Sequence, residues 1–113
     1  MKFLLSHTPT TDYRVELEDT GMIRISKETR FEMLPRDADK IAWFLQAVLD
    51  DKSVRHTYTD NESVFVLDYD PDRPDLEKFT ITRRLRSITM SLGTAAKLLA
   101  ALTGKTEGLV RDE

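Results

Sequence analysis

Apolar and charged residues alternate along the first third of the chain. Tyr13 to Glu18 alternates with a period of two, Asp19-Thr20-Gly21 interrupts it, and Met22 to Ser26 resumes it. A period of two is typical of a strand with one buried and one exposed face. The pattern therefore predicts a hairpin whose turn contains Gly21. A third strand is expected over Thr29 to Leu34.

The spacing of apolar residues changes to three and four after Pro35. This spacing predicts a helix with one face in the core, formed by Ile41, Phe44, Leu45, Val48 and Leu49. Pro35 suits the first turn of such a helix, where Asp37 and Asp39 interact favourably with the helix dipole. Trp43 lies between the apolar positions. We expect it in the core or in helix packing within the monomer, with a dimer contact as the alternative.

The second half of the chain repeats this order of elements. The patterns predict four strands and a helix at Val54 to Tyr58, Glu62 to Tyr69, Phe79 to Arg83, Arg86 to Ser91 and Leu92 to Thr103. The run from Val64 to Leu67 is apolar on both faces, which predicts a central strand covered on both sides. Gly104 is placed to cap the last helix.

Identical or similar residues also recur at matching positions of the two halves. Four residues precede their counterparts by 57 positions, namely Met33 and Met90, Ala38 and Ala95, Lys40 and Lys97, and Ile41 and Leu98. With Phe3 to Leu5 as its first strand, each half has about four antiparallel strands and one helix. We predict an α+β fold made by internal duplication, with repeats at 1–51 and 52–104 that share one core. Residues 105–113 are expected to form a flexible tail.

Composition limits the protein class. A chain of 113 residues with 40% hydrophobic and 33% charged residues is typical of a single globular domain. No stretch approaches the roughly 20 apolar residues that span a bilayer, and the first residues have no secretory signal pattern. The absence of cysteine excludes disulfides and thiolate metal sites. We expect a cytoplasmic protein without membrane association.

One acidic segment resembles part of a calcium loop. Asp68, Asp70 and Asp72 alternate as carboxylate ligands do in such loops. The sixth position is Arg73 where such a loop has glycine, and the twelfth is Phe79 where it has glutamate. A solvated acidic connection is therefore expected here, with no metal.

Catalytic signatures are absent from the sequence. His7 and His56 lie near the ends of equivalent first strands, but two histidines without further ligands do not define a zinc site. There is no nucleophile elbow and no glycine-rich phosphate loop. We expect no enzymatic activity and no cofactor.

Basic residues gather at related positions of the two halves. The candidates for nucleic-acid contact are Arg83, Arg84, Arg86, Arg24, Lys27 and Lys78, with Arg30 in the matching group of the first half. On a sheet surface they could follow a sugar-phosphate backbone while Tyr13, Tyr58 or Tyr69 stack on unpaired bases. The alternative is that the cations balance nearby Glu16, Glu18, Glu28 and Glu32. The net charge of −3 favours that alternative.

Two successive units of four strands and a helix resemble the architecture of the Whirly-like group. This group includes Whirly proteins, PUR-repeat proteins and positive-cofactor-four coactivators. The resemblance covers about residues 2–104 as topology and implies binding of single-stranded DNA or RNA on curved sheets. We therefore expect a non-enzymatic nucleic-acid-binding module, as a monomer or homodimer, in transcription or in phage or plasmid DNA metabolism. The alternative is a small protein-interaction factor, an inhibitor or adaptor that uses the acidic loop or a sheet edge.

Overall fold

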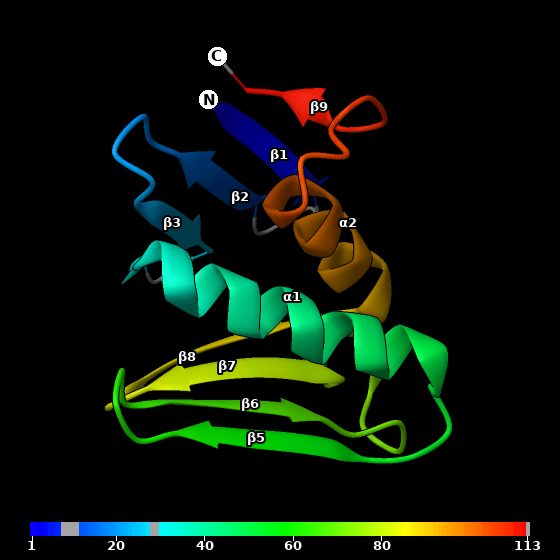
Figure 1. Ribbon diagram of the computed structural model, residues 1–113. Helices are drawn as coiled ribbons and strands as arrows, with labels where there is room; N and C mark the ends of the chain where they lie inside the picture. Colours follow the sequence, from blue (N-terminus) through cyan, green and yellow to red (C-terminus); the bar gives the residue numbers. More distant parts are fainter. Residues whose placement is uncertain (8–11, 28–29, 113) are drawn as a thin grey trace.

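The computed structural model describes residues 1–7, 12–27 and 30–112 (Figure 1). These residues form two antiparallel sheets with two α-helices between them. The elements of the first half are β1 (Lys2–His7), β2 (Asp12–Leu17), β3 (Ile23–Ser26), β4 (Arg30–Met33) and α1 (Pro35–Asp50). Those that follow are β5 (His56–Asp60), β6 (Phe65–Tyr69), the 3-10 turn η1 (Asp75–Glu77), β7 (Phe79–Arg83), β8 (Arg86–Met90), α2 (Leu92–Leu102) and β9 (Val110–Arg111).

The first sheet has the strand order β4-β3-β2-β1-β9. Its inner face is formed by alternate residues such as Phe3, Val15 and Ile25, each at most 1% exposed. The predicted hairpin is present, because Val15 on β2 pairs with Ile25 on β3. Gly21 in its turn has a φ of +89°, and a Cβ there would lie 2.9 Å from Cγ of Pro35. The turn therefore needs glycine both for its backbone and for its packing.

The second sheet has the strand order β5-β6-β7-β8. Leu67, Ile81 and Ile88 occupy paired positions across it and are buried. The prediction that Val64 to Leu67 forms a strand covered on both sides is wrong. Val66 points away from the core and is 39% exposed, whereas Val64 lies in the preceding turn with a φ of 57°. One face of this sheet is covered, and solvent reaches the other.

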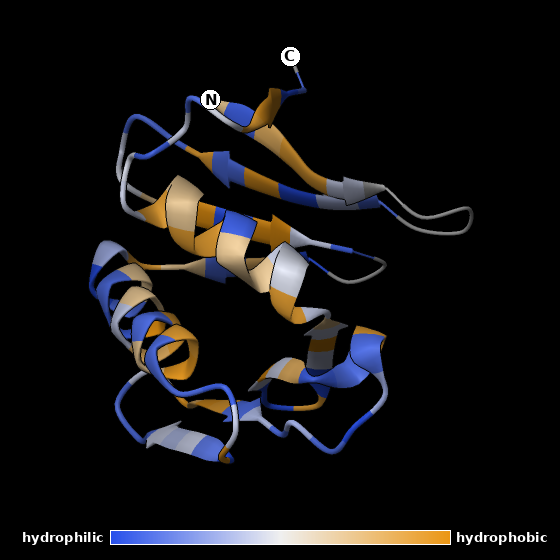
Figure 2. Cartoon of the chain, turned by 90° about the vertical axis from the view of Figure 1, so that its right-hand side faces the viewer, coloured by the Kyte–Doolittle hydropathy of each residue, from blue (hydrophilic) through white to orange (hydrophobic). Residues whose placement is uncertain are grey.

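Each helix packs on the sheet of the other half. Helix α1 follows β4 in the chain but contacts β5 and β6, and its Phe44 ring lies 5.9 Å from Phe79 of β7. Helix α2 follows β8 and contacts β1, β2 and α1. Figure 2 shows the hydrophobic side of α1 turned toward the interior. The two halves therefore share one core.

The order of strands then helix occurs twice in the structure, which confirms the α+β fold class. Both helices begin at matching positions. At α1 the Asp37 carboxylate accepts a hydrogen bond from the Leu34 N–H at 3.1 Å, and at α2 the Ser91 hydroxyl accepts one from the Thr94 N–H at 3.1 Å. Each bond links the residue before a helix to its third residue and stabilises the first turn. Origin by duplication stays a prediction.

Two regions differ from the sequence-based expectation. Trp43 is 66% exposed, so its placement in the core is wrong. The segment expected to be a flexible tail contains β9, which pairs with β1 through Leu4 and Val110. The Asp112 N–H also donates a hydrogen bond to the Lys2 carbonyl at 2.9 Å. The short segment has no regular structure of its own, and β1 at the sheet edge supplies the partners for its backbone hydrogen bonds.

Candidate nucleic-acid interface

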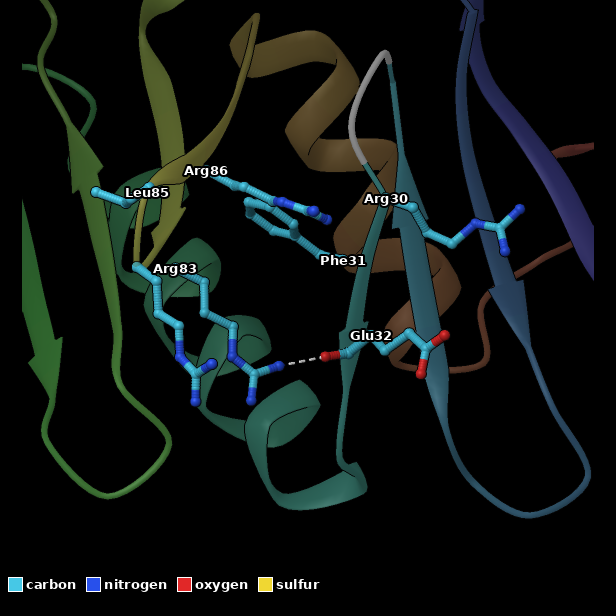
Figure 3. A pocket seen from close by; sticks show the side chains of 7 residues that line it. Arg30, Phe31, Glu32, Arg83, Leu85 and Arg86 are labelled. Carbon is cyan, nitrogen blue, oxygen red and sulfur yellow. Dashed lines mark hydrogen bonds between the residues drawn. The ribbon is translucent and has the colours of Figure 1, made fainter.

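A groove separates the edge of β4 from the hairpin that joins β7 to β8 (Figure 3). Its volume is about 600 Å³, and the residues that line it are Arg30, Phe31, Glu32, Arg83, Arg84, Leu85 and Arg86. Four of these side chains are cationic and one is anionic. The groove therefore concentrates positive charge at the junction of the two sheets, although the protein as a whole is acidic.

The β7–β8 hairpin presents its turn residues to solvent. Arg83 and Arg86 are paired across the strands, which leaves Arg84 and Leu85 as the turn. Arg84 has a φ of 57°, in the left-handed region that a non-glycine residue seldom adopts. Leu85 is 102% exposed, more than any other large apolar residue described. Strain and apolar exposure at one turn are features that often accompany a binding function.

Two contacts hold the walls of the groove together. Nη1 of Arg83 donates a hydrogen bond to the Glu32 carbonyl oxygen on β4. The Tyr13 hydroxyl on β2 donates to the Thr89 carbonyl oxygen on β8 at 2.9 Å. The buried Phe31 side chain extends from β4 toward Arg86 of the hairpin (Figure 3). Arg83 therefore positions the hairpin, while its guanidinium group keeps its positive charge.

The remaining groove arginines are available to a ligand. Arg84 and Arg86 are exposed on the hairpin, and Arg30 is exposed on β4. Within residues 1–7, 12–27 and 30–112, none of the three forms an ion pair with a carboxylate. The guanidinium group carries several N–H donors in a plane that matches phosphate oxygens. These three side chains form the cationic part of the site.

The other predicted contact residues lie outside the groove. Arg24 on β3 forms ion pairs with Glu16 at 2.9 Å, Glu18 at 2.5 Å and Glu32 at 3.2 Å. The hydrogen bond to Glu32, followed by the charges of the other carboxylates, raises the pKa of Arg24. The alternative that cations balance neighbouring glutamates therefore holds for this residue.

Lys27 and Lys78 are also engaged within the protein. The ammonium group of Lys27 lies 5.2 Å from the centre of the Tyr13 ring, a cation–π contact. Nζ of Lys78 donates a hydrogen bond to the Pro71 carbonyl oxygen at 2.6 Å and so closes the acidic loop. The structure brings Arg83, Arg84 and Arg86 together and does not add these lysines to them.

The tyrosines proposed as base-stacking residues are mostly inaccessible. Tyr13 is 4% exposed and Tyr69 is 2% exposed, so their assignment as exposed aromatics is wrong. The Tyr69 hydroxyl donates to the Lys52 carbonyl oxygen at 2.8 Å. Tyr58 is half-buried beside Trp43. Alternation in the sequence placed these rings on inward strand positions, and they fill the core.

The acidic segment after β6 is partly neutralised. Asp68 contacts Arg55 at 3.1 Å and Arg73 at 3.3 Å, and Asp70 lies 3.8 Å from Arg73. Among the described residues there is no group of three or more potential metal ligands placed to hold an ion. The comparison of the two histidines involves the side chain of His7, which lies outside the described part of the chain.

Sequence reasoning missed Leu85 and the approach of the β4 edge to the second hairpin. A detectable signal existed for Leu85, because an apolar residue between Arg84 and Arg86 interrupts a basic turn. No local pattern shows that β4 lies beside the second hairpin, since the groove depends on how the two sheets meet.

Comparisons with protein-family models, curated proteins and solved structures found no match. In the part of the chain that the structure describes, neither helix has the length and apolar character required to cross a membrane.

Proposed function

We propose that this chain is a non-enzymatic module that binds single-stranded DNA or RNA at the groove between β4 and the β7–β8 hairpin. The observation that carries the proposal is that Arg30, Arg84 and Arg86, exposed and without carboxylate partners in the described residues, all line one open groove, with the Arg86 side chain extending toward β4 and that of Arg30 extending from β4 away from the hairpin (Figure 3). The arrangement of strands and helices supports the proposal as a resemblance of topology to the Whirly-like group.

The groove offers the two kinds of contact that an unpaired strand uses. Arg86 extends from the hairpin toward β4, and Arg30 extends from β4 away from the hairpin (Figure 3), so the two can bind phosphates on either side of β4, which supplies affinity without sequence preference. Leu85 at the turn can pack against the face of an unstacked base, whose apolar surface a duplex would keep hidden. A strand with accessible bases should therefore bind better than a duplex.

Titration of labelled single-stranded and duplex oligonucleotides at several salt concentrations tests the proposal. We expect a preference for the single strand and binding that weakens with salt. Replacement of Arg30, Arg84 and Arg86 by alanine should lower the salt slope of log K by about 2, at 0.7 per phosphate contact. Arg83 is left intact because it holds the groove wall.

A control variant keeps the same change in charge on another surface. Replacement of Arg55, Arg73 and Lys97 by alanine should leave most of the binding, since these residues lie outside the groove. Equal losses in the two triple variants would mean that binding depends only on net charge. If the protein binds no oligonucleotide at low salt, the proposal is contradicted and the alternative of a protein-interaction factor is favoured.

A further inference from the structure

Helix α1 exposes one straight stripe of residues along its length. The stripe has the helical spacing of three and four and consists of Arg36, Asp39, Trp43, Gln46 and Asp50. Two of its charges lie symmetrically about Trp43, with Arg36 seven residues before it and Asp50 seven residues after it. An antiparallel copy of the helix centred on Trp43 would place each Arg36 opposite an Asp50.

Strand β5 has the same kind of symmetry. In the described sheet it pairs on one side only, with β6. Its sequence is His56-Thr57-Tyr58-Thr59-Asp60, so an antiparallel copy centred on Tyr58 would place threonine opposite threonine and His56 opposite Asp60. No like charges would face each other in this register. The register therefore suits pairing with an identical strand.

The centres of the two symmetric elements are in contact. The rings of Trp43 and Tyr58 lie edge to face with centroids 6.3 Å apart. The stripe and the strand also run side by side, because Arg36 forms an ion pair with Glu62 at 3.0 Å just beyond the end of β5. A single two-fold axis beside Trp43 and Tyr58 would therefore relate both elements to those of a second copy.

We propose that α1 and β5 form the interface of a symmetric homodimer. The β5 strands of two copies pair antiparallel and join the two second sheets into one eight-stranded sheet. The α1 helices pack antiparallel on the same face of it, with the two Trp43 side chains at the axis and Arg36 opposite Asp50 of the second copy. The partner is a second copy because both elements are self-complementary about the same point.

The spacing of the layers allows both contacts at once. Strands in a sheet lie about 4.8 Å apart. A helix that lies over the β5–β6 pair would therefore be about 10 Å from its symmetry mate when the β5 strands pair, which is the usual distance for packed helices. Helix α1 contacts both β5 and β6. The Trp43 side chains fill the space between the helices.

The β5 edge differs from the other sheet edges in the described structure. Strand β9 is two residues long, and the edges of β4 and β8 each accept one side-chain hydrogen bond, from Arg83 to the Glu32 carbonyl oxygen and from Tyr13 to the Thr89 carbonyl oxygen. Strand β5 has five residues in continuous register with β6 and contains no lysine, proline or bulge. Lysine, proline and bulges are among the features that usually prevent pairing at a sheet edge. Trp43 beside it adds an exposed aromatic side chain of the kind enriched at interfaces.

Sedimentation of the full chain over a range of concentrations tests the proposal by charge exchange. We expect wild-type protein to associate to a dimer. Arg36→Asp and Asp50→Arg should each raise the dissociation constant by about tenfold or more, because each places like charges opposite one another twice. The ion pair between Arg36 and Glu62 is exposed and should contribute little to the fold.

An equimolar mixture of the two variants distinguishes the dimer from a general loss of charge. One copy then has aspartate at both positions and the other has arginine at both, so each pair is attractive and the heterodimer should form. Lys97→Asp on α2 is the control, since it lies outside the proposed interface and should leave association unchanged. Circular dichroism checks that each variant is folded.

Wild-type protein that stays monomeric at several hundred micromolar would overturn the proposal, as would a mixture that associates no better than either variant alone. The interface does not include the groove residues. The Arg30, Arg84 and Arg86 triple variant should therefore dimerise as wild type, so failure of nucleic-acid binding and failure of dimerisation are separate results.

Discussion

The outer faces of the two sheets have different chemistry, although their inner faces follow the same pattern. On the first sheet, Arg24 lies among three glutamates and Arg14 contacts Asp12 and Asp112. The second sheet presents hydroxyl groups instead, from Thr57, Thr59, Thr80, Thr82, Ser87 and Thr89. Burial constrains the inner residues of both sheets, whereas the outer residues are free to differ.

This difference explains why the candidate site lies at a turn rather than on a sheet face. On the first sheet, Arg14 and Arg24 are neutralised by neighbouring carboxylates, whereas Arg30 at the β4 edge is not, and the second sheet has few cations on its face. Within the described residues, Arg30, Arg84 and Arg86 have no carboxylate partner, and all three line the groove where the two sheets meet. Positive charge available to a ligand therefore depends on the local pairing of each residue more than on the net charge of the chain.

The largest expected effect tests whether the inner faces are equivalent. Ile25 and Ile81 are matching core residues, each at most 1% exposed. Ile25→Ala and Ile81→Ala should each lower the free energy of unfolding by about 2–5 kcal/mol through lost burial and a residual cavity. Urea unfolding should show one transition for both variants, because the core is shared. Val66→Ala on the outer face should change stability by no more than about 0.5 kcal/mol.

Two transitions in either core variant would contradict a shared core. A loss confined to one of the two variants would show that the halves contribute unequally, despite their matching patterns.

An intermediate effect tests the two helix-to-sheet contacts. Lys40 on α1 contacts Asp60 at 2.5 Å, whereas Lys97, at the matching position of α2, is exposed. The hydrogen bond from Lys40 holds the pKa of Asp60 well below its usual value, assisted by the Ser63 N–H and the Tyr58 hydroxyl. Lys40→Met should lower stability at neutral pH, and Lys97→Met should leave it nearly unchanged.

The pH dependence of this effect has a definite sign. Because the folded-state pKa of Asp60 is lowered, its contribution is present above the unfolded pKa of about 4 and is lost as the pH falls further. Urea midpoints measured from pH 7 to pH 2 should therefore decline less steeply in Lys40→Met than in wild type. Parallel curves for the two proteins would contradict this role of Lys40.

The smallest expected effect tests the outer faces directly. Arg24→Gln should lower stability slightly at low salt, and the difference from wild type should vanish near 1 M NaCl because exposed ion pairs are screened. Thr80 occupies the matching position on β7, and its buried hydroxyl has no hydrogen-bond partner. Thr80→Val should leave stability unchanged or raise it, at every salt concentration. Thermal unfolding at two salt concentrations measures both effects.

Local patterns predicted most of the fold and only part of the site. Alternation identified β2, β3, β7 and β8, and the spacing of Ile41 and Phe44 identified α1, because these patterns follow from the burial of one face. Trp43 was misplaced because a pattern of apolar residues does not show whether a neighbouring position has a partner. Strand β9 was missed because its pairing with β1 joins opposite ends of the described chain.

The groove depended on contacts that local patterns do not contain. The sequence shows Arg83, Arg84 and Arg86 as a basic cluster. It gives Arg24 the same standing as a candidate nucleic-acid contact, because the carboxylate partners of Arg24 are evident only in the structure. Cross-strand pairs decide which charges remain available, and they depend on register.

The packing of each helix on the sheet of the other half constrains the order of events during synthesis. When the ribosome has completed β1 to β4 and α1, the inner face of these strands still lacks α2 and α1 lacks the sheet it covers. Both apolar surfaces must remain exposed while the second half of the chain, which contains β5 to α2, is being synthesised. The newly made first half is therefore the stage most open to aggregation and to chaperone binding.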